Sequence, residues 1–348
     1  MRIHSDFTGG NICVKQINND TVYLENQLRD TTEDWFYWAF CVEGAGNKQL
    51  TFHFQPNRLG YFGPAVSYDL KNWHWLDKVN DDCFTYTFSA DESKVYFAHS
   101  MLYHPDRFYD FAKEHSICIT ELCKSKKGRS VPCVKLGNGD KSIILTARHH
   151  ACESTGSYVL EGVLSELLKS ELMTDYTVFC VPFVDFDGVI DGDQGKSRRP
   201  YDHNRDYNPE MASIYPETAA IREYADENGC VFGFDFHSPW HRGRENDTVF
   251  IVQNCFEKLD SLNRFGETLE NSITDDSLKY EHKNDYPFGT GWNKGGNQFA
   301  AYMTKKPEND VAFTLETAYF GSENNKVNEQ RLLSLGKCFA NALKEYIS

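Results

Sequence analysis

Two histidines, a cysteine and a glutamate stand close together in "TARHHACES", residues 146–154. On a helix or a tight turn, residues three positions apart point to the same side, so His150 and Glu153 can bind one ion. Imidazole nitrogen and carboxylate oxygen are both zinc ligands. His149 and Cys152 would point to other sides. The pair alone is weak evidence, because a polar helix start has the same composition.

A third metal ligand is available at the end of another apolar run, "FGFDFHSPW". His237 beside the pair of His150 and Glu153 would give the two-histidine, one-glutamate set of catalytic zinc sites, with a fourth position open for water. A histidine bonded to a backbone carbonyl in the core is the alternative. Asp235, two residues earlier, is a candidate partner of a metal ligand or of a substrate-binding residue.

Candidates for acid–base catalysis and substrate binding occur in two further segments. Glu316 lies inside the apolar stretch "VAFTLETAYFG", where a carboxylate is costly unless it is paired or used. A salt bridge and a role as general base are both consistent with this position. In "DHNRDYN", Asn204 and Arg205 can clamp a carboxylate, because guanidinium binds carboxylate in a bidentate manner. A solvated polar loop would have the same composition.

The second part of the chain supplies the elements that would position these residues. Residues 141–148, 176–185, 229–237 and 310–318 are nearly continuous apolar runs, as expected of strands buried on both faces. Helical patterns over residues 156–172, 209–229 and 328–347 alternate with them. This order predicts an α/β fold with a mixed, mostly parallel sheet flanked by helices. Sites in such sheets form beyond the carboxyl ends of the strands.

The first part of the chain has a different pattern. Short segments rich in aromatic and β-branched residues follow one another up to about residue 96, separated by turn residues. They predict an antiparallel β-sandwich whose aromatic side chains fill the core. Residues 97–115 resemble a connecting helix. We therefore expect two domains, a sandwich over 1–110 and a catalytic α/β domain over 111–348.

Composition restricts the partners and the compartment. The net charge of -15 argues against nucleic acid or an anionic membrane, which both require clustered lysine and arginine. The N-terminus carries no apolar secretory segment, and no apolar run is long enough to span a bilayer. Eleven cysteines without a CxxC pair indicate reduced thiols. A cytoplasmic protein is expected.

Taken together, these segments resemble the zinc metallocarboxypeptidases, and within them the cytosolic carboxypeptidase branch. "ARHHACES" is similar to the family motif "ARVHPGET", which makes His150 rather than His149 the ligand. "FDFHSPW" is similar to "DLHGHS", and "FTLETAYFG" to "YTLESSFCG". "DFDGVIDGD", "YDHNR" and the hairpin "ITELCKSKKGRSVPCVKLG" resemble further family segments. The similar segments follow the family order over nearly the whole chain.

The resemblance implies a sandwich domain followed by a carboxypeptidase domain, and a mechanism. One zinc ion per chain would be held by His150, Glu153 and His237. The zinc would polarise the scissile carbonyl and acidify a water molecule. Glu316 would take the proton of that water and pass it to the leaving amine. Asn204 and Arg205 would hold the terminal carboxylate, so the C-terminus of a peptide or protein is the expected substrate.

Two positions depart from the family pattern. Gly195 stands where the family usually has an arginine that stabilises the oxyanion. Basic residues nearby are candidates to replace it: Lys196, Arg198 and Arg199. In the cytosolic branch a basic residue near "GTxR" helps to select acidic side chains, whereas here Trp292 takes that place, with Lys294 nearby. The removal of C-terminal glutamates is therefore not implied.

Two other functions stay open. A related zinc deacylase would act on a small acylated amino acid, although such relatives usually lack the N-terminal sandwich. A non-catalytic binding protein with a decayed site is the other alternative, and the retained ligands, Glu316 and the Asn204–Arg205 pair argue against it.

Overall fold

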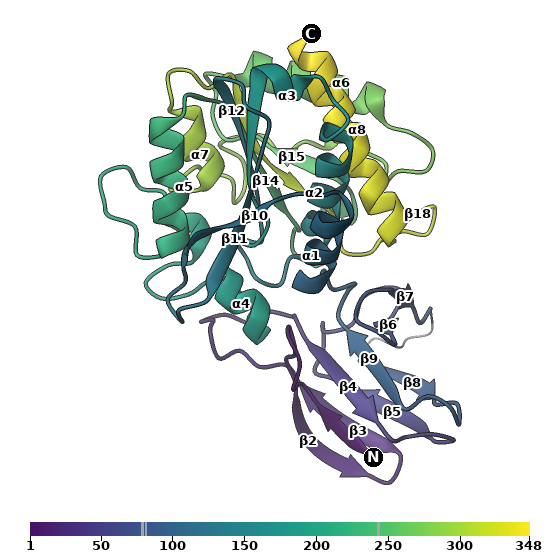
Figure 1. The fold of residues 1–348 in the computed structure, drawn as a ribbon. Helices are drawn as coiled ribbons and strands as arrows, with labels where there is room; N and C mark the ends of the chain where they lie inside the picture. Colours follow the sequence, from purple (N-terminus) through teal and green to yellow (C-terminus); the bar gives the residue numbers. More distant parts are fainter. Residues whose placement is uncertain (78–79, 81, 242–243) are drawn as a thin grey trace.

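The computed structural model describes residues 1–77, 80, 82–241 and 244–348, which form a β-rich N-terminal part and a larger α/β part (Figure 1). The N-terminal part is the expected sandwich of two sheets. One sheet has the order β1 (Arg2–His4), β4 (Ala39–Glu43), β9 (Lys94–Ala98), β6 (Ala65–Ser67), β7 (His74–Trp75). The other has the order β2 (Cys13–Asn18), β3 (Thr21–Glu25), β5 (Gln49–His53), β8 (Cys83–Thr87).

The sandwich differs from the expectation in one strand pair. β3 and β5 pair in parallel, because the chain crosses to the other sheet as β4 between them. The other pairs are antiparallel. Aromatic side chains fill the space between the sheets, as predicted, and Trp38, Phe40, Phe52 and Phe97 are fully buried there.

The α/β part is built on a seven-stranded mixed sheet. Its strands lie in the order β10 (Ile119–Lys124), β11 (Ser130–Leu136), β13 (Tyr176–Val181), β12 (Lys141–Ala147), β14 (Cys230–His237), β16 (Val311–Glu316), β15 (Phe250–Val252). The four strands β13, β12, β14 and β16 are parallel, and β10, β11 and β15 add antiparallel pairs at the two edges. The sheet is therefore mixed and parallel at its centre, as the apolar runs predicted. A short hairpin, β17 (Gly321–Ser322) with β18 (Asn325–Lys326), follows β16.

Helices cover both faces of this sheet (Figure 1). One face packs against α2 (Ser154–Leu167), α6 (Leu259–Ser272) and α8 (Glu329–Ile347). The other packs against α5 (Pro216–Glu227) and α7 (Phe299–Thr304). Successive residues of β12 alternate between the two cores, Ile143 and Leu145 facing one and Ile144 the other. The described residues also form α3 (Leu172–Asp175), α4 (Phe186–Asp191) and the 3₁₀ turns η1 (His203–Arg205), η2 (Arg244–Asp247) and η3 (His282–Asn284), and a further helix joins the two parts of the chain.

Two details refine the expected elements. The helix predicted within residues 209–229 begins at Pro216 and not at Pro209, and Pro216 lies in the first turn, where no backbone donor is needed. The connecting helix is α1 (Pro105–Glu114), so the expected domain border between residues 110 and 111 falls inside it. In the described part of the chain, no helix combines the length and the apolar character that a membrane span needs.

Candidate metal centre and active site

The candidate residues gather at the carboxyl ends of three neighbouring parallel strands. β12 ends at Ala147, β14 at His237 and β16 at Glu316. The strand register pairs His237 with Glu316 and Ala147 with Phe236, so the three ends lie level with one another. This is the edge at which parallel sheets form sites.

A tight turn after β12 brings His150 and Glu153 together. Arg148 adopts a left-handed backbone conformation, with φ of 62°, and turns the chain away from the strand direction. Its buried guanidinium donates to the carbonyl of Ala151 at 2.9 Å and to that of Tyr103 at 3.2 Å, which fixes the turn. Glu153 then lies directly before α2.

The ligand atoms of His150, Glu153 and His237 all lie within 4.8 Å of one another, and the three residues are buried. Nδ1 of His150 is 3.0 Å from Oε1 of Glu153, and Nδ1 of His237 is 2.6 Å from Oε2. Burial favours a neutral acid, but the neighbouring cationic groups, His150 foremost, hold the pKa of Glu153 well below its usual range. Two imidazole nitrogens and a carboxylate therefore converge on one point, and they are a zinc donor set.

Asp235 orients the histidines behind this point. Its Oδ2 accepts from Nε2 of His237 at 2.6 Å, and its Oδ1 lies 2.8 Å from Nδ1 of His149. Nε2 of His149 is 2.7 Å from the hydroxyl of Tyr207. Both ring nitrogens of His149 are thus engaged away from Glu153, as the sequence predicted, although the group of His149, Asp235 and His237 is equally compact. The Asp235 carboxylate is an ion-pair and hydrogen-bond partner of His237.

Glu316 occupies the end of β16 with a carboxylate that is not neutralised by a salt bridge among the described residues. Its buried Oε2 has no hydrogen-bond partner in that part of the chain. Burial and the neighbouring charge of Glu153 raise the pKa of Glu316 to about 7. A carboxyl group with a pKa near neutrality can both accept and release a proton, as a general base requires.

A cavity of about 430 Å³ joins most of the candidates. Its lining includes His150, His237, Glu316, Lys196, Asn204 and Arg205. Asn204 and Arg205 belong to η1, and the backbone N–H of Phe299 donates to Oδ1 of Asn204 at 3.1 Å. Arg205 is exposed, and its Nη1 donates to the carbonyl of Asn204 at 3.0 Å. A terminal carboxylate can therefore reach the guanidinium from inside the cavity.

The candidate basic residues differ in their contacts and in their distance from the metal-ligand group. Nζ of Lys196 lies 2.5 Å from Oε1 of Glu153 and 4.5 Å from the ring of Trp35. Burial opposes its charge, but Glu153 outweighs burial and the pKa of Lys196 is raised. Lys196 is thus the cation beside the metal-ligand group.

Arg198, Arg199 and Lys294 do not line this cavity. The guanidinium of Arg198 contacts three carboxylates at 2.8–3.0 Å: Asp30, Asp185 and Asp193. Arg199 and Lys294 are exposed. Arg198 is thus held in an ion-pair network and Lys294 is exposed, so the interpretation of Arg198 and Lys294 as oxyanion or specificity residues stays a prediction that their positions do not support.

The loop that carries Lys196 is held by the N-terminal part of the chain. The carboxylate of Asp30 accepts from the backbone N–H groups of Gln194 at 3.0 Å and Gly195 at 2.8 Å, and from Nε of Arg198 at 3.0 Å. The side chain of Gln194 bonds both backbone groups of Tyr37 at 2.9 Å. Sequence reasoning did not find these residues, because more than 150 positions separate the partners and no motif marks them.

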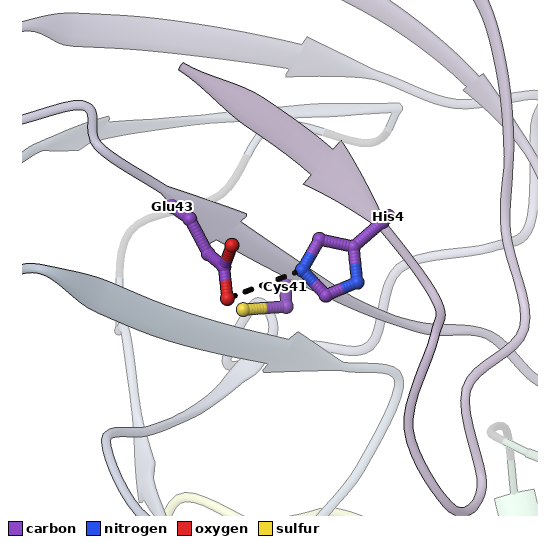
Figure 2. A group of neighbouring side chains, drawn as sticks. All are labelled: His4, Cys41 and Glu43. Atoms are coloured by element: carbon purple, nitrogen blue, oxygen red, sulfur yellow. Dashed lines mark ion pairs between the residues drawn. The ribbon is translucent and has the colours of Figure 1, made fainter.

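The sandwich carries a separate group of metal-ligand residue types (Figure 2). His4 on β1 faces Glu43 on β4, and Cys41 lies beside them. The N–H of Asp6 donates to Nδ1 of His4 at 3.1 Å, and Nζ of Lys94 lies 3.0 Å from Glu43. Burial and Glu43 raise the pKa of Cys41 to about 12, so its thiol stays protonated. We assign this group to cross-strand pairing.

Comparison with known proteins agrees with the architecture. Residues 109–318 match the family model described as zinc carboxypeptidase, and residues 3–99 match the cytosolic carboxypeptidase N-terminal domain. The fold defines a metallocarboxypeptidase architecture preceded by a sandwich. Because the first match covers more than half of the sequence, the chain belongs to the zinc carboxypeptidase family.

Individual relatives are distant. The chain is 26% identical to an uncharacterized protein of Zymomonas mobilis over 92% of this chain and 88% of that protein. It is 28% identical to human cytosolic carboxypeptidase 2 over 72% of this chain and 34% of the relative. The chain thus spans about a third of the human relative's length.

Solved structures share the whole fold. A metallo-carboxypeptidase from Pseudomonas aeruginosa superposes with a TM-score of 0.83 at 20% identity, covering 100% of this chain and 99% of its own. One from Burkholderia cenocepacia gives 0.79 at 19% identity, with 99% and 98% covered. At this identity the likeness establishes the fold alone.

Proposed function

We propose that this chain is a zinc-dependent metallocarboxypeptidase that removes the last residue of peptides or protein tails. One observation carries the proposal: a single cavity brings together two histidines of the ligand set, Glu316 and the Asn204–Arg205 pair. A metal-ligand group, a carboxyl group with a raised pKa and a carboxylate-binding guanidinium are the parts that such a reaction needs. Membership of the zinc carboxypeptidase family supports the same reaction.

The residues present fit one zinc ion, held by His150, Glu153 and His237. Their compact donor atoms and their burial match a site that binds the metal through nitrogen and oxygen. Zinc in this position supplies a Lewis acid that polarises a carbonyl group and acidifies water. The Asp235 carboxylate holds Nε2 of His237 and thereby leaves Nδ1 directed at the ligand point.

Residues of the chain itself transfer the proton, stabilise the oxyanion and bind the substrate's terminal carboxylate. Glu316 accepts a proton from the attacking water and delivers it to the leaving amine. Lys196, the buried cation beside Glu153, replaces the family arginine and stabilises the negative oxygen that develops on the scissile carbonyl. Arg205 binds the terminal carboxylate and Asn204 assists it, so that cleavage is limited to the last peptide bond.

The test follows peptide masses during incubation with the zinc-loaded protein. We expect free-acid peptides to lose single C-terminal residues, and matched peptides with an amidated C-terminus to persist. Glu316→Gln should keep zinc but reduce kcat by about 10²- to 10⁴-fold, the usual contribution of a general base. Turnover by Glu316→Gln at the wild-type rate would contradict the mechanism. Hydrolysis of acylated amino acids in place of peptides would point to a deacylase.

Two further assignments belong to this proposal. We propose that residues 1–110 and 111–348 are the sandwich and catalytic domains, with α1 as the joint between them. We also propose that the protein acts in the cytoplasm, which its resemblance to the cytosolic carboxypeptidases and its eleven free cysteines support. Limited proteolysis and fractionation of cells would test the two assignments.

A further inference from the structure

The six tryptophans of the chain fall into two groups. Trp38, Trp73 and Trp75 are buried in the sandwich and at its contact with the α/β part. The other three, Trp35, Trp240 and Trp292, all line the active-site cavity. They come from three distant segments, one of them in the N-terminal part. Every tryptophan outside the cores therefore borders the same opening.

Trp240 and Trp292 are exposed and Trp35 is half-buried, and all three indoles are held in place by contacts. Trp240 is 44% exposed and Trp292 60% exposed. The rings of Trp35 and Trp240 lie 5.1 Å apart, and Trp292 stacks on Tyr286 at 4.7 Å. Nε1 of Trp35 donates to the hydroxyl of Ser197 at 3.2 Å. Exposed clustered aromatic surface on a soluble fold marks a binding site, and rigid indoles lose little entropy when they bind a ligand.

The charges around the cavity do not suit an acidic substrate. Among the described lining residues, the lysine and arginine side chains are Lys196 and Arg205. Lys196 faces Glu153, and Arg205 is assigned to the terminal carboxylate. Neither is therefore left to pair with an acidic side chain of the substrate. The net charge of -15 also repels an acidic tail before it reaches the cavity.

We propose that the three indoles form a subsite for a large apolar side chain next to the scissile bond. The last residue of the substrate enters the cavity towards Glu316, so the residues before it leave across the exposed rim. The substrates are then peptides or protein tails that carry an aromatic or large aliphatic residue before the last one, and that lack an acidic run. This inference rests on the proposed carboxypeptidase function.

The experiment uses peptides with alanine as the last residue and Phe, Leu, Ala, Lys or Glu before it. Initial rates with the zinc-loaded protein give kcat/KM, and calorimetry with zinc-loaded Glu316→Gln gives Kd without turnover. We expect kcat/KM to be about tenfold higher for the Phe and Leu peptides than for the Ala and Glu peptides, as burial of one large side chain allows. For the same reason, we expect their Kd to be about tenfold lower. Most of the difference should lie in KM, because the indoles contact the substrate away from the reacting bond.

Trp240→Ala and Trp292→Ala are the informative variants, since both side chains are exposed and their removal leaves the core intact. Each should lower the Phe-to-Ala ratio of kcat/KM towards one. Tyr109→Ala is the matched control, an exposed aromatic residue on α1 outside the cavity lining.

A preference for Lys or Glu, or a Phe-to-Ala ratio that is unchanged in both tryptophan variants, overturns the subsite. If all peptides were shortened at equal rates, the subsite would be contradicted and the proposed function would stand. If the peptides were neither bound nor shortened, the proposed function would be contradicted as well.

Discussion

The ends of β12, β14 and β16 and the loop over residues 192–205 both contribute to the cavity, but different forces position them. The strand ends are fixed by the ladder of the central sheet, which sets His237 level with Glu316. The loop has no such ladder, and its first half is held by Asp30 and by the backbone of Tyr37. The sheet ladder therefore positions His237 and Glu316, whereas the position of Lys196 depends on the sandwich as well.

Removal of a strand-end ligand should have the largest effect. His237→Ala leaves two ligands of the proposed set, so we expect loss of bound zinc and of measurable peptidase activity. Zinc content after dialysis and the peptide assay measure the two. His149→Asn is the neighbouring control, which should keep zinc with affinity reduced by no more than about 10- to 100-fold, as for a residue behind the ligands. Equal zinc loss from both variants would mean that His149 is a ligand.

Loss of the loop cation should have the next largest effect. Lys196→Met keeps the length of the side chain and its packing on Trp35 but removes the charge. We expect kcat to fall about 10²- to 10³-fold with little change in KM, as when an oxyanion donor is removed. Lys127→Met, at an exposed lysine paired with Asp191, should behave as wild type. A fall confined to KM would assign Lys196 to substrate binding instead.

The clamp residue at the end of the loop should matter less. Arg205→Ala removes the guanidinium that binds the terminal carboxylate, a charged hydrogen bond of about 1.5–3 kcal/mol. We therefore expect kcat/KM for free-acid peptides to fall about 10- to 100-fold, mainly through KM. Initial rates over a range of peptide concentrations measure the split. If the variant discriminated against amidated peptides as strongly as wild type, another group would bind the carboxylate.

Sequence reasoning was most effective where chemistry and structure are encoded in one segment. Each proposed ligand and Glu316 lies at or just after an apolar run, so strand ends and candidate residues could be located together. The sandwich and the mixed, mostly parallel sheet were likewise predictable from the spacing and length of the runs. The parallel pair of β3 and β5 was missed, because segment patterns do not specify which strands pair.

The loop shows why the remainder could not be predicted. Composition placed Lys196, Arg198 and Arg199 on equal terms, since all three are basic residues in one polar stretch. Their tertiary contacts distinguish them: Lys196 pairs with Glu153, whereas Arg198 is held by three carboxylates, those of Asp30, Asp185 and Asp193. Asp30 lies more than 160 positions away, in a segment without a recognisable motif. The choice among basic residues is thus a tertiary property.

A change at Asp30 tests this dependence and should have the smallest effect on activity. Asp30→Asn weakens the acceptor of two backbone N–H groups and the charge beside Arg198, so the loop should loosen. We expect kcat to fall about tenfold, because the residues that support the geometry of the site are loosened. We expect the free energy of unfolding to fall by about 2 kcal/mol, because charged hydrogen bonds are weakened. Denaturant unfolding and the peptide assay measure both, with Asp91→Asn, at an exposed acid of the sandwich, as the control. Reduced stability with unchanged kcat would show that the sandwich braces the fold without positioning Lys196. A fall in kcat that Lys196→Met does not deepen further would show that both substitutions act through the same side chain, because effects of coupled residues do not add.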